Sequence, residues 1–360
     1  MNIEPEYFDK PVAVRANESP DMEKLKAYLK GRLVGVGDDL QIEQFPGGYS
    51  NLTFLLKSGE NEFVLRKPPF GANIKSAHDM GREFKVLSAL QPVYAAIPQP
   101  LLYCEDEDVL GTPFYIMQRV KGIILRNKIP KGLHLDVDTM RTISESAVDN
   151  LAKLHTIDLN STGLIHLGKP EGYVTRQVEG WVKRYYNAQT EEVGDMDKTA
   201  EWLRANIPAE NSPAFIHNDY KYDNLVLNPN DLSDILAVLD WEMATVGDPL
   251  MDLGTTLAYW GEAGDSEALK PFNLTWLEGN LNREQVLVRY QEKTGTDTGN
   301  FLFYYVFGSF KIAVIVQQIY ARYKKGFTQD PRFASLIYVV KACAENAQQA
   351  IRYNRISNFY

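Results

Sequence analysis

The sequence predicts an α+β fold with two lobes. Residues 1–120 are expected to form a small, mostly antiparallel β-sheet with one important helix, and residues 121–360 a larger and mainly helical lobe. Three observations support this division. A chain of 360 residues exceeds the usual size of a single hydrophobic core. Short apolar segments separated by turn residues dominate the first third, whereas helical periodicity dominates after Gly122.

In the N-terminal lobe, the pattern begins with a helix. Leu25, Leu29 and Leu33 fall on one face of a helix over residues 22–33. The acidic stretch 105–108 is expected to be a turn between two strands. Strands are expected over 42–45, 53–57, 62–66, 101–104 and 114–118, with the important helix over 77–90.

The C-terminal lobe is expected to be helical over 139–155, 174–188, 196–206 and again after Gly247. Its longest apolar stretch runs from Phe301 to Val316 and is interrupted by Gly308, Ser309 and Lys311. Because a membrane span needs about 20 mostly apolar residues, we interpret this stretch as a buried helix.

Composition narrows the class of protein. The formal net charge of −9 argues against nucleic acid as a partner, since phosphate backbones are held by basic patches. Two distant cysteines, Cys104 and Cys343, form no disulfide framework and suit a reducing cytoplasm. The N-terminus is acidic and lacks the apolar core of a signal peptide. We therefore expect a cytoplasmic protein that binds neither nucleic acid nor a membrane.

The segment from Phe215 to Glu242 carries the strongest chemical signal. It places Asp219, Asn224 and Asp240 on a predicted strand, a short loop and a second strand. Phosphoryl transfer needs one carboxylate facing the acceptor hydroxyl, and an amide plus a carboxylate that hold metal on the nucleotide phosphates. Any one of these residues alone could simply hydrogen-bond a local turn. The three at this spacing match the arrangement of kinases.

Neighbouring residues are assigned supporting roles. Lys221 could neutralise charge on the transferred phosphoryl group, or be a solvated surface lysine. His217 and His155 are interpreted as structural. Asp252 is expected to accept hydrogen bonds from backbone N–H groups of the loop that carries Asp219, called the catalytic loop below. Glu242 is left open between a metal ligand and a same-face neighbour of Asp240.

The N-terminal lobe contains a candidate phosphate site. Gly47-Gly48-Tyr49-Ser50-Asn51 lies between two predicted strands, and its backbone N–H groups could face phosphate oxygens, although a plain hairpin turn is the alternative. Arg66 ends a strand where kinases place a phosphate-contacting lysine. Glu83, on the next helix, is expected to pair with it, against the alternative of a surface ion pair. Lys67 would point to the opposite face of the strand.

Asp219, Asn224 and Asp240, together with the run Asp248-Pro249-Leu250-Met251-Asp252-Leu253, resemble the aminoglycoside phosphotransferase and choline kinase superfamily, which has the protein-kinase-like fold. Phe63–Pro69 and His217–Asn224 look closest to the subgroup that is fused, in some eukaryotes, to an acyl-CoA dehydrogenase. The resemblance covers most of the chain, from Gly47 to the helices after Gly254, and no dehydrogenase part is expected within these 360 residues.

By this resemblance Asp219 would be the catalytic base and Asn224 and Asp240 the Mg²⁺ ligands. The backbone from Gln118 to Val120 would hold the adenine of ATP, with the base of GTP as the alternative. Two departures stand out: arginine replaces the usual lysine at position 66, and Trp241-Glu242 follows Asp240. No segment resembles a protein-kinase activation loop ending in Ala-Pro-Glu, so a protein substrate is not expected.

The expected activity is an ATP- and Mg²⁺-dependent phosphotransfer to the hydroxyl of a small molecule. The subgroup is associated with hydroxyacyl-CoA or hydroxy acids, which we favour, whereas the acidic net charge suits an aminoglycoside or a choline-like amine. A pseudokinase that binds nucleotide without catalysis, and a scaffold that binds only proteins, are the alternatives outside enzymes. The sequence predicts no oligomeric state.

Overall fold

The computed structural model describes residues 8–15, 17–46, 51–69, 79–328 and 330–359. By their packing the residues form two units. Unit 1 contains residues 1–124 and 225–244, and unit 2 contains residues 125–224 and 245–360. The boundary between lobes at residues 120 and 121 stays a prediction from sequence.

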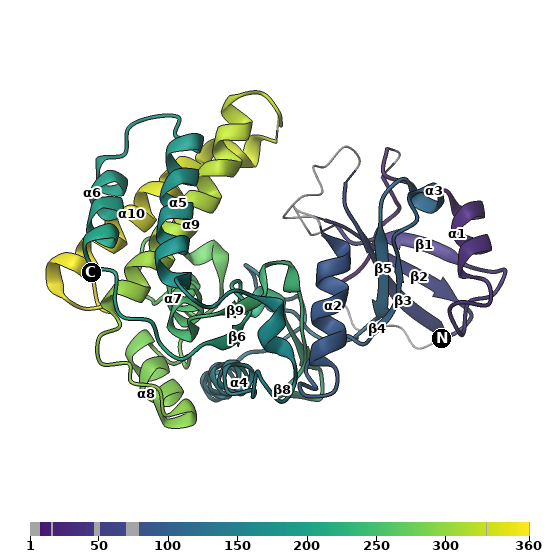
Figure 1. Cartoon of the computed structure of the whole chain (residues 1–360), viewed down its shortest axis with the longest axis horizontal. Coiled ribbons are helices and arrows are strands. Elements are labelled where there is room, and N and C mark those ends of the chain that lie inside the picture. The colour runs from purple at the N-terminus through teal and green to yellow at the C-terminus, as the bar shows by residue number, and fades with distance from the viewer. Residues whose placement is uncertain (1–7, 16, 47–50, 70–78, 329, 360) are drawn as a thin grey trace. The chain divides into compact units, whose positions relative to one another are not determined.

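Unit 1 is built on a five-stranded antiparallel sheet (Figure 1). Its strand order is β1-β2-β3-β5-β4. Strand β3 lies in the middle, paired with β2 through Thr53 opposite Arg66 and with β5 through Tyr115 opposite Arg66. The strands are β1 (Gln41–Gln44), β2 (Leu52–Ser58), β3 (Asn61–Lys67), β4 (Pro100–Cys104) and β5 (Phe114–Gln118), each close to its predicted range.

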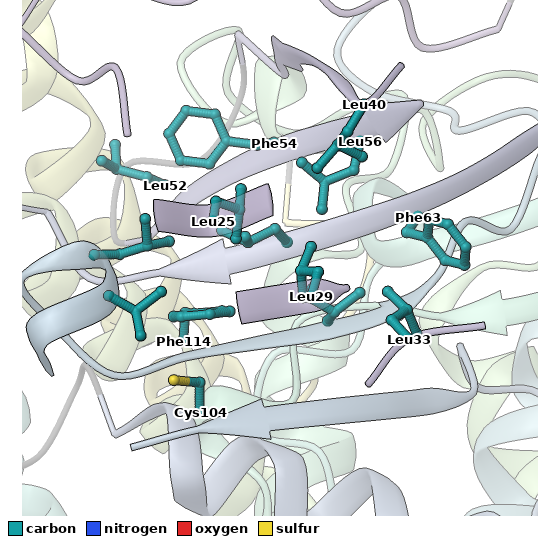
Figure 2. Close-up of a cluster of buried hydrophobic side chains, with 14 residues drawn as sticks. Leu25, Leu29, Leu33, Leu40, Leu52, Phe54, Leu56, Phe63, Cys104 and Phe114 are labelled. Atoms are coloured by element: carbon teal, nitrogen blue, oxygen red, sulfur yellow. The ribbon is translucent and has the colours of Figure 1, made fainter. Parts of the chain in front are cut away.

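Helices cover both faces of this sheet (Figure 1). Helix α1 (Met22–Leu29) is shorter than predicted, because the chain turns at Gly31 with a positive φ of 75°. Leu25 and Leu29 of α1 pack on sheet residues that include Phe54 and Phe114 to form the core shown in Figure 2. Helix α2 (Met80–Leu90) is capped by the Asp79 side chain.

The turn predicted over 105–108 is wrong. The structure has a one-turn helix there, α3 (Glu107–Leu110), which ends at Gly111 with a φ of 75°. The Asp106 carboxylate accepts a hydrogen bond from the N–H of Asp108 at 2.9 Å. A residue type that favours turns also caps helices, which explains the error.

Unit 1 also contains a hairpin from later in the chain. Strand β7 (Leu225–Asn228) pairs with β8 (Asp231–Val238), and Ile123 forms a two-hydrogen-bond bridge to Leu227. Asp240 follows with a φ of 67° and precedes the 3-10 turn η3 (Trp241–Met243). The buried Trp241 indole donates to the Val238 carbonyl at 2.8 Å. This hairpin brings the second aspartate of the motif to the sheet of unit 1.

Unit 2 is mainly helical, as predicted. Strand β6 (Ala214–Ile216) pairs with β9 (Thr245–Gly247), a strand that the sequence did not indicate. The 3-10 turns are η1 (Leu164–Leu167), η2 (Tyr222–Asn224), η4 (Lys270–Phe272) and η5 (Pro331–Ser335). The helices are α4 (Val137–His155), α5 (Tyr173–Ala188), α6 (Gly194–Ala205), α7 (Pro249–Tyr259), α8 (Arg283–Thr294), α9 (Leu302–Lys324) and α10 (Leu336–Tyr353). The small antiparallel sheet of unit 1 and the helical unit 2 confirm the predicted α+β fold class.

Helix α9 occupies the centre of unit 2, packed against α5, α7 and α10 (Figure 1). It is longer than the predicted apolar stretch. Its length and composition would allow it to cross a membrane, but 78% of its most apolar window is buried inside the protein. Burial of this kind is typical of a core helix, in agreement with the interpretation from sequence.

Two glycines let α7 and α9 approach closely. A Cβ added to Gly308 of α9 would overlap the backbone carbonyl of Gly254 in α7, and one added to Gly254 would overlap the Tyr304 carbonyl. We expect Gly308→Ala to destabilise the protein by about 1–3 kcal/mol, because backbone has to move.

Chemical denaturation at equilibrium measures this change. Gly180→Ala in α5 is the control, since its added methyl group would meet only the movable end of Arg184 and alanine favours a helix. Equal stability of the Gly308→Ala variant and the wild-type protein would contradict the close-approach argument.

Candidate active site

The loop that carries Asp219 is held by a buried carboxylate of α7. Strand β6 ends at Ile216, and the next two backbone N–H groups, of His217 and Asn218, each donate to Asp252 at 2.7 Å. Asp252 therefore supports the loop as the sequence predicted. The same carboxylate lies 3.1 Å from Nε2 of His155. Although burial opposes ionisation, hydrogen bonds from His155 and the loop lower the pKa of Asp252 below its usual value.

Both predicted histidines have structural contacts. His155 is held between Asp252 and the Tyr290 hydroxyl, which lies 2.7 Å from Nδ1. The N–H of Asp219 donates to Nδ1 of the fully buried His217 at 3.2 Å. His217 thus braces the backbone at Asp219.

The Asp219 carboxylate lies among three polar side chains of unit 2. Lys221 places its ammonium 3.1 and 2.9 Å from the two carboxylate oxygens. Asn224 donates from Nδ2 to Oδ2 of Asp219 at 3.0 Å and to its backbone carbonyl at 2.9 Å. The ring of Tyr259 lies 4.7 Å from the Lys221 ammonium. The predicted proximity of Asp219 and Asn224 is therefore present.

Lys221 is a permanent cation at this position. Burial alone would lower the pKa of its ammonium, but the Asp219 carboxylate raises the net value above the ordinary range. The ammonium is therefore charged throughout the neutral range. Its predicted contact with a transferred phosphoryl group stays a prediction.

In unit 1, Arg66 joins two carboxylates. Its Nη1 lies 2.5 Å from Oε1 of Glu83 on α2, and its Nη2 lies 3.1 Å from Oδ1 of Asp240. The Arg66 and Glu83 side chains are only 9% and 1% exposed, which excludes a solvated surface pair. Lys67 points to the other face of β3, where its ammonium donates to the Leu110 carbonyl at 3.0 Å. The choice of Arg66 over Lys67 as the partner of Glu83 agrees with this geometry.

Burial and charge act in opposite directions on this pair. Burial disfavours the guanidinium, but the carboxylates of Glu83 and Asp240 raise the pKa of Arg66 well above its usual value. Burial raises the pKa of Glu83, and the positive charge of Arg66 offsets part of that rise. Arg66 therefore stays charged and is fixed in direction by the two acids.

The residues that follow Asp240 are tied to α2 and to Asn51. Arg82 of α2 donates to the carbonyls of Glu242 and Ala244, at 3.3 and 2.6 Å. Nδ2 of the buried Asn51 donates to Oε2 of Glu242 at 2.8 Å. Glu242 thus contacts the predicted nucleotide loop through Asn51. The other residues of that loop, Gly47, Gly48, Tyr49 and Ser50, lie outside the described residues.

The segment predicted to hold adenine, residues 118–120, begins at Gln118, the last residue of β5. The N–H of Gln118 already donates to the Gln99 carbonyl at 2.8 Å. Arg119 and Lys121 both pair with Glu62 of β3, at 2.5 and 2.9 Å. These ion pairs hold the backbone around Val120 to the sheet. The assignment of Gln118 and Val120 to the nucleotide base stays a prediction.

The donor atoms of the two predicted metal ligands suit Mg²⁺, a hard cation that prefers oxygen. The Asn224 side chain donates from its nitrogen Nδ2 to Asp219, and its carbonyl oxygen Oδ1 is the atom that would bind a cation. Asp240 offers a carboxylate that is 35% exposed. Asn224 belongs to unit 2 and Asp240 to unit 1, so their joint role rests on the sequence motif.

Three residues near these sites were missed by the sequence reasoning: Arg82, Tyr259 and Lys311. Arg82 is next to Glu83, so a search for cations on the same helix could have found it. Lys311 lies in the middle of α9, and its ammonium donates to the Asn218 carbonyl at a distance of 2.8 Å. Its signal was a charged residue within an apolar stretch, which the sequence reasoning treated only as an interruption.

Comparison with known proteins gives a match to a family model. The model of the phosphotransferase enzyme family matches residues 41–287. Acyl-CoA dehydrogenase family member 11 of Rattus norvegicus is 35% identical over 340 residues, which is 92% of this chain and 43% of that protein. The chain thus spans less than half the length of this curated relative.

Solved structures agree with the predicted protein-kinase-like fold. A Ralstonia eutropha protein, provisionally described as an aminoglycoside phosphotransferase, is 30% identical with a TM-score of 0.76; the match covers 92% of this chain and 99% of that one. Choline kinase from Cryptosporidium parvum matches with a TM-score of 0.64 at 13% identity, over 93% of this chain and 97% of that one. The second likeness concerns the fold alone.

Proposed function

The chain belongs to the phosphotransferase enzyme family, and from this premise we propose that it transfers the γ-phosphoryl group of ATP to the hydroxyl of a small molecule. The observation that carries the proposal is the position of the Asp219 carboxylate, which contacts both Lys221 and Asn224. Asp252 fixes the loop of Asp219 by accepting a hydrogen bond from the Asn218 N–H. A carboxylate in a fixed position can orient an acceptor hydroxyl, and a cation beside it can offset the negative charge on a phosphoryl group.

In this mechanism Asp219 accepts the hydrogen bond of the acceptor hydroxyl and takes its proton as the phosphoryl group leaves ATP. Lys221 neutralises charge that develops on the transferred oxygens. Arg66, fixed by Glu83, contacts the nucleotide phosphates, and the segment 118–120 holds the base. Asn224 and Asp240 would hold Mg²⁺, which, when bound, supplies positive charge to the phosphate oxygens.

For the acceptor we propose a hydroxyacyl-CoA or a hydroxy acid. The support is the likeness to acyl-CoA dehydrogenase family member 11, whose name refers to acyl-CoA chemistry. Two cations also lie near Asp219, since Lys221 pairs with its carboxylate at 2.9 Å and Lys311 donates to the carbonyl of the preceding residue, Asn218, at 2.8 Å. Positive charge around the base favours an anionic acceptor. An aminoglycoside or a choline-like amine is the second candidate, supported by the names of the two solved structures.

An ADP-release screen tests the proposal. We expect ATP and Mg²⁺ to give ADP with hydroxyacyl-CoAs or hydroxy acids, at rates well above those without acceptor, and little ADP when Mg²⁺ is omitted. Aminoglycosides, choline-like amines and sugars are assayed side by side, and a response to an amine alone would favour the second candidate. Stabilisation by ATP in a thermal-shift assay without turnover on any acceptor would indicate a pseudokinase. Absence of both would indicate a scaffold. We propose a cytoplasmic location, which fractionation of cells expressing the tagged chain tests.

A further inference from the structure

Lys311 is a fully buried lysine in the middle of α9, and its ammonium points at the catalytic loop. Only 1% of the residue is exposed. Nζ lies 2.8 Å from the backbone oxygen of Asn218, 3.3 Å from the side-chain oxygen of the same residue and 3.4 Å from the Thr255 hydroxyl. An ammonium group has three donors, and three acceptors surround it. Each of the three N–H groups of the protonated amine therefore has an acceptor within reach.

The Asn218 carbonyl belongs to the peptide that leads into Asp219. The other polar end of that peptide, the N–H of Asp219, donates to His217. The peptide before it is held through the Asn218 N–H by Asp252. Asn218 itself has a φ of 69°, a left-handed conformation that asparagine adopts more readily than most residues and that the contacts around it enforce here. Lys311 supplies one of these enforcing contacts.

We propose that Lys311 is a positioning residue for phosphoryl transfer, whose ammonium fixes the Asn218–Asp219 peptide and thereby sets the direction of the Asp219 carboxylate. The inference rests on the proposed function, because it takes Asp219 as the group that orients the acceptor. Lys311 acts through the backbone and does not contact the reacting atoms. We call the contact between the Lys311 ammonium and the Asn218 carbonyl the clamp. Because a small displacement of a reacting group lowers the reaction rate strongly, loss of the clamp should affect turnover more than binding.

Charged side chains of both signs act on Lys311. Asp252 on α7 and Asp219 favour its ammonium, whereas Lys221 and Arg184 of α5 oppose it. Burial is the largest influence and lowers the pKa of Lys311 from 10.5 to about 8. The clamp is therefore charged at pH 7 and loses its proton in mildly alkaline solution. The neutral amine has two donors for three acceptors, which weakens the hold on Asn218.

Stability and activity should respond to this titration with opposite signs. The pKa of Lys311 is lower in the folded protein than in the unfolded chain, so the unfolded chain binds more protons between about pH 8 and 10.5. The contribution of this group to stability therefore rises with pH across that range. Turnover, in contrast, should fall as the ammonium is lost. An alkaline loss of turnover without loss of structure is the signature of the clamp.

The first test is the pH dependence of kcat, with the acceptor found in the ADP-release screen. Wild-type kcat is expected to fall above about pH 8, while Lys311→Met, which keeps length and removes the charge, lowers kcat at pH 7 by about 10- to 100-fold. The variant should also lack the alkaline fall and leave the KM for ATP nearly unchanged. Lys311→Arg retains charge and should move the fall to higher pH. A Lys311→Met enzyme with wild-type kcat, or a wild-type profile that stays flat to pH 9.5, would overturn the proposal.

The second test needs no acceptor, so failure of the proposed function leaves it decisive. Hydrogen exchange of the segment 215–224, corrected for the intrinsic effect of pH, should accelerate in wild type between pH 7 and 9 and be fast at both pH values in Lys311→Met. Lys67→Met is the matched control, because Lys67 is also buried and donates to a backbone carbonyl, at 3.0 Å. That variant should leave exchange in 215–224 unchanged. Equal protection of the segment in wild type and Lys311→Met would refute the clamp.

Discussion

Replacing Asp219 by asparagine is expected to lower kcat by about 10²- to 10⁴-fold, with little change in the Kd for ATP. Asparagine keeps the size of the side chain but accepts no proton from the acceptor. It also removes the negative charge that pairs with Lys221 at 2.9 Å. Steady-state kinetics and nucleotide titration measure the two effects separately.

The control for this variant is Asp223→Asn on the same loop. Asp223 pairs with Arg126 at 2.6 Å and is 34% exposed, so its loss tests the general effect of removing a loop carboxylate. We expect kcat of the control within a few-fold of wild type. Equal kcat in Asp219→Asn and wild type would remove Asp219 from the mechanism.

The second large effect concerns the buried pair in unit 1. Arg66→Met leaves the Glu83 and Asp240 carboxylates without their shared cation, and we expect a loss of about 3–5 kcal/mol in the free energy of unfolding. Since Arg66 is also proposed to contact nucleotide phosphate, the Kd for ATP should rise by roughly 10- to 100-fold, the worth of a charge-assisted hydrogen bond. Urea denaturation and calorimetry measure these two quantities.

A double variant separates the structural from the binding role. Arg66→Met combined with Glu83→Gln removes one buried charge of each sign, and we expect it to recover part of the lost stability. Affinity for ATP should not recover, because the cation is still missing. Recovery of both together would mean that Arg66 supports the fold alone.

The contacts between residues close in the chain could be predicted from sequence. Asp219 and Asn224 are five residues apart, so loop length alone brings them together, and the structure has them hydrogen-bonded at 3.0 Å. Arg66 and Glu83 are on consecutive elements, and strand alternation correctly sent Lys67 to the other face. Patterns of this kind depend on a few neighbouring residues, so they can be recognised without knowledge of how the helices and strands pack.

The long-range parts could not be predicted. Lys311 is 93 residues from Asn218, and only the packing of α9 against α7 brings them together. Gly308 interrupts the same apolar stretch for a different reason, the close approach of two helix backbones. The sequence shows that a lysine and a glycine disturb an apolar helix. The sequence contains no signal that indicates which loop Lys311 contacts or which helix Gly308 packs against.

The fate of the phosphoryl group shows whether the protein transfers it from ATP to an acceptor with Asp219 as the base. The wild-type protein and Asp219→Asn are incubated with isotopically labelled ATP, Mg²⁺ and each acceptor of the screen, and the products are identified by mass spectrometry. We predict one acceptor that gains a labelled phosphoryl group on its hydroxyl, in stoichiometric amount with ADP, in the wild-type reaction and at a strongly reduced rate in the variant. Label that passes only to water, or to the acceptor equally fast in both proteins, would contradict the account.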